Sequence, residues 1–241
     1  MDRALYAAAT GMAAQQLNLD VIANNLANAD VAGFKGSVAT FTELAAPGET
    51  GLGTAPLGEH VVFARGRLSK ADGAFDVAID GPGFFSLVDD RGKRAYTRSG
   101  EFSRAADGSL RNALGYRLEG VRIPNAALSV SVSEDGLVTM STRSGRSVVG
   151  RIRLAAFPAP DRLRALGGTI FEATSASGTP RMVNPGGSGP RVRFGMLEES
   201  NVSIVEAMMS MLAAQRAYEA DAKGVQAADE MLRIANNLQR G

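Results

Sequence analysis

Apolar side chains recur every seven residues near the N-terminal end of the chain. They are Leu5, Met12, Leu19 and Leu26, with Ala8, Gln15 and Ile22 at the intermediate three- and four-residue steps. This spacing is that of an a/d seam, and it predicts an amphipathic helix from Asp2 to about Asn28. Turn-forming residues follow at Asp30 and Gly33, so we expect the helix to end there.

A second amphipathic pattern occupies the C-terminal end, from about Asn201 to Leu238. Its stripe consists of Val205, Met208, Leu212, Gln215, Ala222, Val225, Met231 (or Leu232) and Leu238. Ser203 and Glu206 have the spacing of a capping box, which marks a helix start, although Ser200 and Asn201 are alternative caps. A helix of ~38 residues would be ~57 Å long. This length predicts a helix packed in a coiled coil or array.

Between the two helical patterns, residues 35–197 indicate β-structure. The predicted strands are Phe75–Asp80, Phe84–Val88, Leu128–Val132, Ser147–Phe157 and Val192–Leu197. The pairs Asp107-Gly108 and Asp135-Gly136 are typical of hairpin turns, and residues 175–191 are expected to be loop.

The fold class is therefore mixed α and β. We predict a central all-β domain, sandwich- or barrel-like, flanked by long N- and C-terminal helices that pair as a coiled coil. The expected divisions are an N-terminal helix at 1–30, a connecting segment at 31–74, the β domain at 75–197 and a C-terminal helix at 198–241.

Composition weighs against several kinds of chemistry. The chain has no Cys and one His, so thiolate and multi-His metal sites are excluded, and we expect neither metal nor cofactor. With 26 Lys+Arg and 25 Asp+Glu the net charge is +1, which argues against nucleic-acid binding. We expect no membrane insertion, because no apolar run has the length of a span. A cleaved signal peptide is not expected either, because Leu5 is the only strong aliphatic residue near Arg3.

A hydrolase is the enzymatic alternative, and it would need acids or a base that converge in a pocket. Its most plausible members are Asp76, Asp80 and His60. No G-x-S-x-G motif accompanies His60, so an exposed or edge-strand position is the preferred interpretation of this residue.

Polar amides interrupt the helical stripes. Gln15 and Gln215 stand where Leu would be more stabilising, and Asn24, Asn25 and Asn28 cluster at the end of the first helix. A buried amide in a seam costs stability but fixes register and partner. We predict that these amides set the register between subunits; the alternative is that the stripe faces water at these points.

Five blocks of the sequence resemble the bacterial flagellar rod and hook proteins. They are residues 17–35 (LNLDVIANNLANADVAGFK), 76–85 (DVAIDGPGFF), 95–102 (AYTRSGEF), 199–202 (ESNV) and 215–219 (QRAYE). The blocks occur in the family's order and span nearly the whole chain. The start Met1-Asp2-Arg3 resembles the proximal rod protein and residues 17–35 resemble the distal one. The stretch Glu43–Val61 is shorter than distal rod proteins carry.

This resemblance implies a structural subunit of the flagellar basal-body rod, the helical drive shaft that transmits torque from motor to hook. It implies export through the flagellar export apparatus without a cleaved signal, and a place in the rod where it spans the periplasm. Its partners would be copies of itself and other rod and hook axial proteins. The terminal helices would lie in the core of the tube, disordered before assembly, with the β domain outside. A fibre or adhesin module is a further alternative.

The candidate assembly interface follows from the two stripes and the matching blocks. On the N-terminal side it comprises Leu5, Met12, Gln15, Leu19, Ile22, Asn24, Asn25, Leu26, Asn28, Gly33 and Phe34. On the C-terminal side it comprises Asn201, Val202, Val205, Met208, Leu212, Gln215, Tyr218, Val225, Met231 and Leu238.

Overall fold

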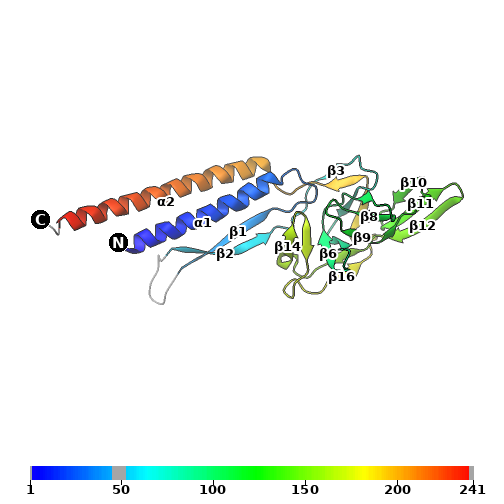
Figure 1. Ribbon diagram of the computed structural model, residues 1–241, viewed down its shortest axis with the longest axis horizontal. Coiled ribbons are helices and arrows are strands. Elements are labelled where there is room, and N and C mark those ends of the chain that lie inside the picture. The colour runs from blue at the N-terminus through cyan, green and yellow to red at the C-terminus, as the bar shows by residue number, and fades with distance from the viewer. Residues whose placement is uncertain (1, 45–52, 239–241) are drawn as a thin grey trace. The chain divides into compact units, whose positions relative to one another are not determined.

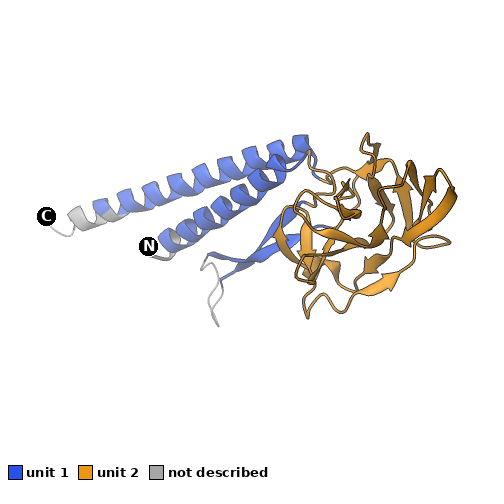
Figure 2. Ribbon diagram, turned by 45° about the vertical axis from the view of Figure 1, so that its right-hand side comes forward, with its two compact units in different colours: residues 1–29, 36–62, 202–241 blue, residues 30–35, 63–201 orange. Residues whose placement is uncertain are grey.

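The computed structural model describes residues 2–44 and 53–238. The chain forms two units, coloured blue and orange in Figure 2. The helical unit consists of residues 1–29, 36–62 and 202–241, and the β unit consists of residues 30–35 and 63–201. The chain is thus mixed α and β, with a helix at each end and a β-rich centre.

Two long helices form most of the helical unit (Figure 1). Helix α1 spans Asp2–Ala27 and helix α2 spans Ile204–Leu238, close to the predicted bounds. Helix α1 ends where predicted, and the amide of Asn28 still donates to the carbonyls of Asn24 and Asn25 at 3.2 Å. Ser203 caps α2 by accepting a hydrogen bond from the Glu206 amide to its Oγ at 3.4 Å, as the capping pattern predicted.

A β-hairpin completes the helical unit. Strand β1 (Ser37–Glu43) pairs antiparallel with β2 (Thr54–Val61), with Ser37 opposite Val61. Helix α1 contacts both this hairpin and α2, and so lies between them (Figure 1). The hairpin falls within residues 31–74, the expected connecting segment, and within the range 35–197 that the sequence indicated as β-structure, although no strand was predicted there.

One large antiparallel sheet dominates the β unit. Its strand order is β10 (Ser129–Val132), β11 (Leu137–Thr142), β12 (Gly145–Arg151), β9 (Arg117–Arg122), β5 (Phe84–Val88), β6 (Arg94–Thr97), β15 (Ile170–Glu172) and β14 (Arg164–Gly167). The pair β7 (Ser103–Arg104) and β8 (Ser109–Arg111) joins β9, and β13 (Leu154–Ala156) joins β5 and β16 (Arg181–Val183). A 3-10 helix spans Pro160–Arg162. The sandwich- or barrel-like closure stays a prediction.

Two smaller strand pairs use the last strands before α2. Strand β17 (Arg191–Phe194) pairs with β4 (Val77–Asp80), and β18 (Met196–Glu198) pairs with β3 (Leu68–Lys70). The chain therefore leaves the β unit beside strands that come early in the sequence.

The core of the β unit is centred on strand β5. Phe85 and Leu87 are fully buried with residues from distant strands, including Ile79, Leu118, Ile123, Ile152, Leu154 and Ile170. Phe63, Phe84, Tyr96, Phe157 and Phe171 form a set of edge-to-face ring contacts. Burial of this much aliphatic and aromatic surface is the main source of the unit's stability.

Two predicted strands are each divided in the structure. The predicted strand Ser147–Phe157 is β12 followed by β13, because the chain changes neighbours between Arg151 and Leu154. The predicted strand Val192–Leu197 breaks at Gly195, whose φ of 69° is accessible to glycine and whose amide donates to the Asp76 carbonyl. The predicted loop 175–191 contains the short strand β16.

Candidate assembly surfaces and a buried ionic cluster

Small residues line the contact between α1 and α2. Ala14 of α1 is buried, and so are Ala214 and Ala228 of α2. Gly11 of α1 faces Asp221 of α2, and a Cβ placed on Gly11 would lie 3.0 Å from the Asp221 Oδ2 atom. Side chains this small let two helix backbones approach closely, so the larger apolar residues of α2 are left for other faces.

The predicted N-terminal interface residues differ in exposure. Ile22, Gly33 and Phe34 are buried, Asn24 is exposed, and Leu5, Met12, Gln15, Leu19, Asn25, Leu26 and Asn28 are partly exposed. Gly33 and Phe34 belong to the β unit. Val21, which the seam pattern did not include, is buried beside Ile22. Contacts of α1 with both α2 and the hairpin explain why more than one stripe of this helix is covered.

Two of the predicted amides make hydrogen bonds inside the chain. Asn25 Nδ2 donates to the Ser37 carbonyl at 2.7 Å, and the Ser37 amide donates to Asn25 Oδ1 at 2.8 Å. Asn28 Nδ2 donates to the Asn24 carbonyl at 2.8 Å. Asn25 thus joins the end of α1 to the start of the hairpin.

An apolar stripe of α2 faces away from the contact with α1. Ile204, Val205, Met208, Met209 and Leu212 occupy the first turns of the helix, and Val205 and Met209 are 67% and 66% exposed. Among the other predicted residues of this side, Gln215, Tyr218 and Met231 are exposed, and Asn201, Val202 and Val225 are partly exposed. The side chain of Leu238 lies outside the described residues. Clustered large apolar groups on one helix face are typical of a surface that another molecule covers.

The residues named for a hydrolase have other roles. Asp76 accepts a hydrogen bond from the Gly73 amide at 3.0 Å, and Asp80 pairs with Arg65 at 2.8 Å and Arg193 at 3.2 Å. His60 is exposed on β2 beside Thr40, the edge-strand position that the sequence indicated. Within residues 2–44 and 53–238, no group of three or more His, Asp or Glu side chains has the arrangement of a metal site.

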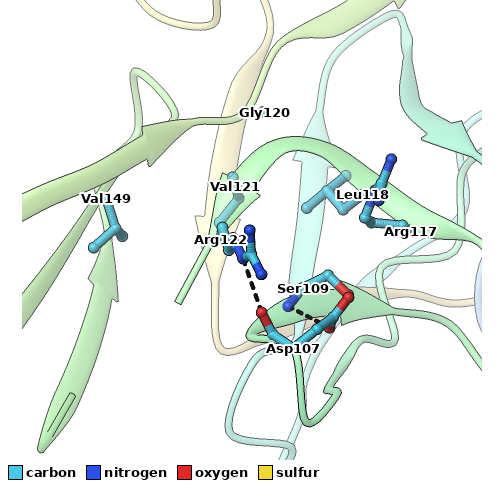
Figure 3. Close-up of a pocket in the computed structure, with 8 residues that line it drawn as sticks. All are labelled: Asp107, Ser109, Arg117, Leu118, Gly120, Val121, Arg122 and Val149. Carbon is cyan, nitrogen blue, oxygen red and sulfur yellow. Dashed lines mark hydrogen bonds between the residues drawn. The ribbon is translucent and has the colours of Figure 1, made fainter. Parts of the chain in front are cut away.

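A shallow polar depression lies between β8, β9 and β12 (Figure 3). The Arg122 Nε atom donates to the Asp107 carbonyl at 2.8 Å, and the Ser109 amide and hydroxyl donate to Asp107 Oδ1 at 3.0 and 2.6 Å. The Ser109 hydroxyl lowers the pKa of Asp107, because it stabilises the carboxylate. Asp107 therefore stabilises the turn that leads into β8.

A cluster of three buried charges, which sequence reasoning missed, lies in the β unit. Lys35 Nζ donates to Glu198 Oε1 at 2.7 Å, and Arg98 Nε donates to Glu198 Oε2 at 2.8 Å. The side chains of Lys35, Arg98 and Glu198 are 1%, 6% and 0% exposed. Burial lowers the pKa of Lys35 and that of Arg98, and the contact with Glu198 opposes both effects. We call these three residues the junction cluster.

No described helix is apolar enough over sufficient length to cross a membrane.

Three segments of the chain match families of flagellar proteins. Residues 5–35 match the family of flagella basal body rod proteins, and residues 78–140 match the D1 domain of the flagellar hook protein FlgE/F/G. Residues 194–238 match the C-terminal part of the flagellar basal body rod FlgEFG proteins.

Full-length relatives agree with these matches. The chain is 38% identical to the flagellar basal-body rod protein FlgG of Borreliella burgdorferi over 100% of both chains. It is 31% identical to FlgG of Bacillus subtilis over 100% of both chains. It is 33% identical to the rod protein FlgF of Caulobacter vibrioides, over 98% of this chain and 97% of the relative. The chain belongs to the flagellar basal-body rod protein family, and its role is that of a structural rod subunit. These relatives give no support to a hydrolase or an adhesin.

Proposed function

We propose that this rod subunit polymerises through its terminal helices into the helical drive shaft that carries torque from motor to hook. In this proposal the candidate interface residues of α1 and α2 contact neighbouring copies and other rod and hook proteins. A helical tube arises from heterologous contacts that do not close, in which a stripe on one copy meets a different surface of the next copy.

The observation that carries the proposal is the apolar stripe Ile204, Val205, Met208, Met209 and Leu212. It lies on a helix whose other side already packs on α1, so an intramolecular partner among the described elements does not cover it. Methionine packs adaptably against different neighbours, which suits a surface that meets several related subunits. Exclusion of this stripe from water would contribute to the free energy of assembly.

The same proposal includes coiled-coil pairing of α1 and α2. Ala207, Ala214, Asp221 and Ala228 are buried or partly buried, and they recur every seven residues along α2. This repeat supports a seam in which α2 presents one face to α1 and a different face to other subunits.

Several further features of the proposal come from the family. The subunit would be exported by the flagellar export apparatus without a cleaved signal, and the rod would span the periplasm. We assign it no enzymatic activity, no cofactor and no nucleic-acid partner. The absence of cysteine from the sequence supports export of an unfolded chain, because such a chain has no thiols that could form disulfide cross-links during export.

A charge introduced into the stripe tests the proposal. Leu212→Asp is expected to abolish rods in a deletion strain that expresses the variant, because a buried carboxylate without a partner opposes assembly. Ala213→Asp is the matched control, since Ala213 is exposed and lies about 100° around the helix from Leu212. Electron microscopy of isolated basal bodies gives the result. Normal rods from the Leu212→Asp strain, with the protein secreted at wild-type levels, would contradict the proposal.

The ordering of the ends is tested on the dilute monomer. If contacts with neighbouring subunits stabilise the terminal helices, these helices should open more readily than the β unit in the monomer, and limited proteolysis should cut within residues 2–27 and 204–238 well before the β unit. Equal resistance of the helices and the β unit would show that order of the ends does not depend on assembly.

A further inference from the structure

The chain passes between its two units four times. The crossings lie between residues 29 and 30, 35 and 36, 62 and 63, and 201 and 202. On the β-unit side, three short segments make these four crossings. They are residues 30–35, which take part in two crossings, residues 63–67 and residues 198–201. Each piece of the helical unit therefore begins or ends at one of these segments.

Lys35 and Glu198 bind all three segments to one another. Lys35 Nζ donates to the Ala64 carbonyl at 2.9 Å as well as to Glu198. The Gly66 amide donates to the same Glu198 Oε1 atom at 2.9 Å, and the Gly33 amide donates to the Glu198 carbonyl at 2.6 Å. The Asn201 side chain adds a bond to the Ala64 carbonyl at 3.2 Å. One carboxylate and one ammonium group thus join segments that are far apart in the sequence.

Arg98 fixes this arrangement to the body of the β unit. Its Nη1 atom donates to the carbonyls of Gly81 and Gly83 at 2.9 and 2.6 Å, and its Nη2 atom donates to the Ile79 carbonyl at 3.3 Å. Because the guanidinium group also binds Glu198, the three crossing segments are held against strand β4 and the turn that follows it.

Backbone packing at two glycines leaves this geometry little freedom. A Cβ on Gly66 would lie 1.9 Å from the Glu199 carbonyl oxygen. Gly33 has a φ of 71°, and a Cβ there would lie 2.3 Å from the Ser99 amide nitrogen. Both positions require glycine, because any side chain would separate the segments that the junction cluster joins.

Stability alone does not require such a cluster. Well-packed apolar side chains of similar volume are often as stabilising as a buried ion pair, whereas directional charge-assisted bonds fix a particular arrangement. The three segments that match flagellar families each contribute one member, since Lys35 lies in 5–35, Arg98 in 78–140 and Glu198 in 194–238.

We propose that Lys35 and Glu198 are positioning residues that hold the four crossings of the chain together at one place on the β unit, with Arg98 as their anchor. Each of the segments so joined continues directly into a piece of the helical unit. The functional value of this arrangement rests on the proposed rod function. In a subunit that carries torque, force between the helices and the β unit would be shared by all four crossings.

Hydrogen exchange of the full-length protein, resolved by residue, tests the inference. Lys35→Met removes the charge and keeps the length of the side chain, and Glu198 retains Arg98 as a partner. Amides of residues 33–37, 63–67 and 199–202 should exchange at least tenfold faster, while those of β5 and β6 are unchanged. Arg67→Met is the control, because the Arg67–Glu199 pair joins the same segments in an exposed position, and it should change none of these rates.

Two results would overturn the inference. Faster exchange confined to residues 33–37 would show that Lys35 does not hold the other crossings. Equal acceleration in β5 and β6 would show that Lys35 contributes only to overall stability. These measurements use the monomer, so their failure is distinct from a failure of the assembly test on Leu212.

The unmodified protein gives an independent test that needs no variant. In low concentrations of urea, the amides of Gly33, Gly66 and Glu199 should open with one common free energy and one common urea dependence. Separate values for the three amides would show that the crossings open independently, and this would also overturn the inference.

Discussion

The side-chain amide of Asn25 binds both backbone polar groups of Ser37, with distances of 2.7 and 2.8 Å. An asparagine at the end of α1 therefore satisfies the amide and the carbonyl of the first residue of β1, as the backbone of a neighbouring strand would.

Asn25→Ala should weaken the attachment of the hairpin to α1. Two hydrogen bonds are lost, so the expected cost is about 1–2 kcal/mol in the free energy of unfolding of the helical unit. Urea unfolding followed by helix circular dichroism measures this cost. Asn24→Ala serves as the control, since the exposed Asn24 contributes its backbone carbonyl, not its side chain, to the Asn28 bond. Equal costs for the two variants would contradict the role of the Asn25 amide.

Gly11→Leu should force α1 and α2 apart. The Asp221 carboxylate occupies the space that a side chain on Gly11 would need, so the variant should lose helix signal and cooperativity in thermal unfolding. Gly224→Leu provides a comparison within α2, because nothing lies within 4 Å of a Cβ at Gly224. That variant should gain helical stability of up to about 1 kcal/mol. Similar losses in both variants would show that the result reflects leucine itself, not the contact with Asp221.

Ser203→Ala should loosen the first turn of α2. Loss of the cap leaves the Glu206 amide without its side-chain acceptor, at an expected cost of about 1 kcal/mol. Faster hydrogen exchange in residues 204–207 would report it. Ser210→Ala, a substitution of the same kind at an exposed position inside the helix, should slow exchange slightly or leave it unchanged. An unchanged first turn in Ser203→Ala would mean that the cap contributes nothing measurable.

The β unit should lose stability in acid. Hydrogen bonds from Ser133, from Lys93 and Arg164, and from Arg67 lower the pKa of Asp135, Glu172 and Glu199, respectively. A carboxyl whose pKa is lower in the folded state stabilises the fold above its unfolded pKa, and this contribution is lost as the pH falls through the folded pKa. The urea midpoint should therefore be insensitive to these groups above about pH 5.5 and should fall below about pH 4.5.

Ser109→Ala separates one contribution to this acid response. It removes the hydroxyl that lowers the pKa of Asp107, so the fall in the midpoint should become shallower. Ser103→Ala is the control, because the Ser103 hydroxyl donates to a backbone carbonyl and not to a carboxylate. A midpoint that stays constant down to pH 3 in the unmodified protein would contradict the prediction.

The elements whose apolar residues recur at regular intervals were predictable from the sequence. Both helices and strand β5 lie where periodicity and turn residues predicted them, since each pattern is local. Strands β12 and β13 were predicted as one, because an alternating pattern does not reveal that a chain exchanges one neighbouring strand for another at Ile152. The face of α2 that meets α1 was also missed, since alanine is weak in a hydrophobic pattern although its small size favours close helix packing.

The junction cluster could not be predicted from local sequence patterns, for a different reason. Lys35 and Glu198 are single charges in unrelated surroundings, and their pairing depends on the tertiary fold. The only local signal is that each stands beside positions expected to be buried, Lys35 after Phe34 and Glu198 at the end of an apolar strand. The predicted interface residues Gly33 and Phe34 are next to this site in the sequence, but the charged group that forms the ion pair belongs to Lys35, which follows them.

Lys35 and Glu198 are 163 positions apart, and this separation sets an order of events for a chain delivered N-terminus first. During synthesis, Lys35 leaves the ribosome long before the carboxylate that it binds. Strands β17 and β18, which pair with β4 and β3, emerge equally late. The bond between Lys35 and Glu198 and the pairing of β3 and β4 with their partners are therefore among the last contacts of the β unit to form.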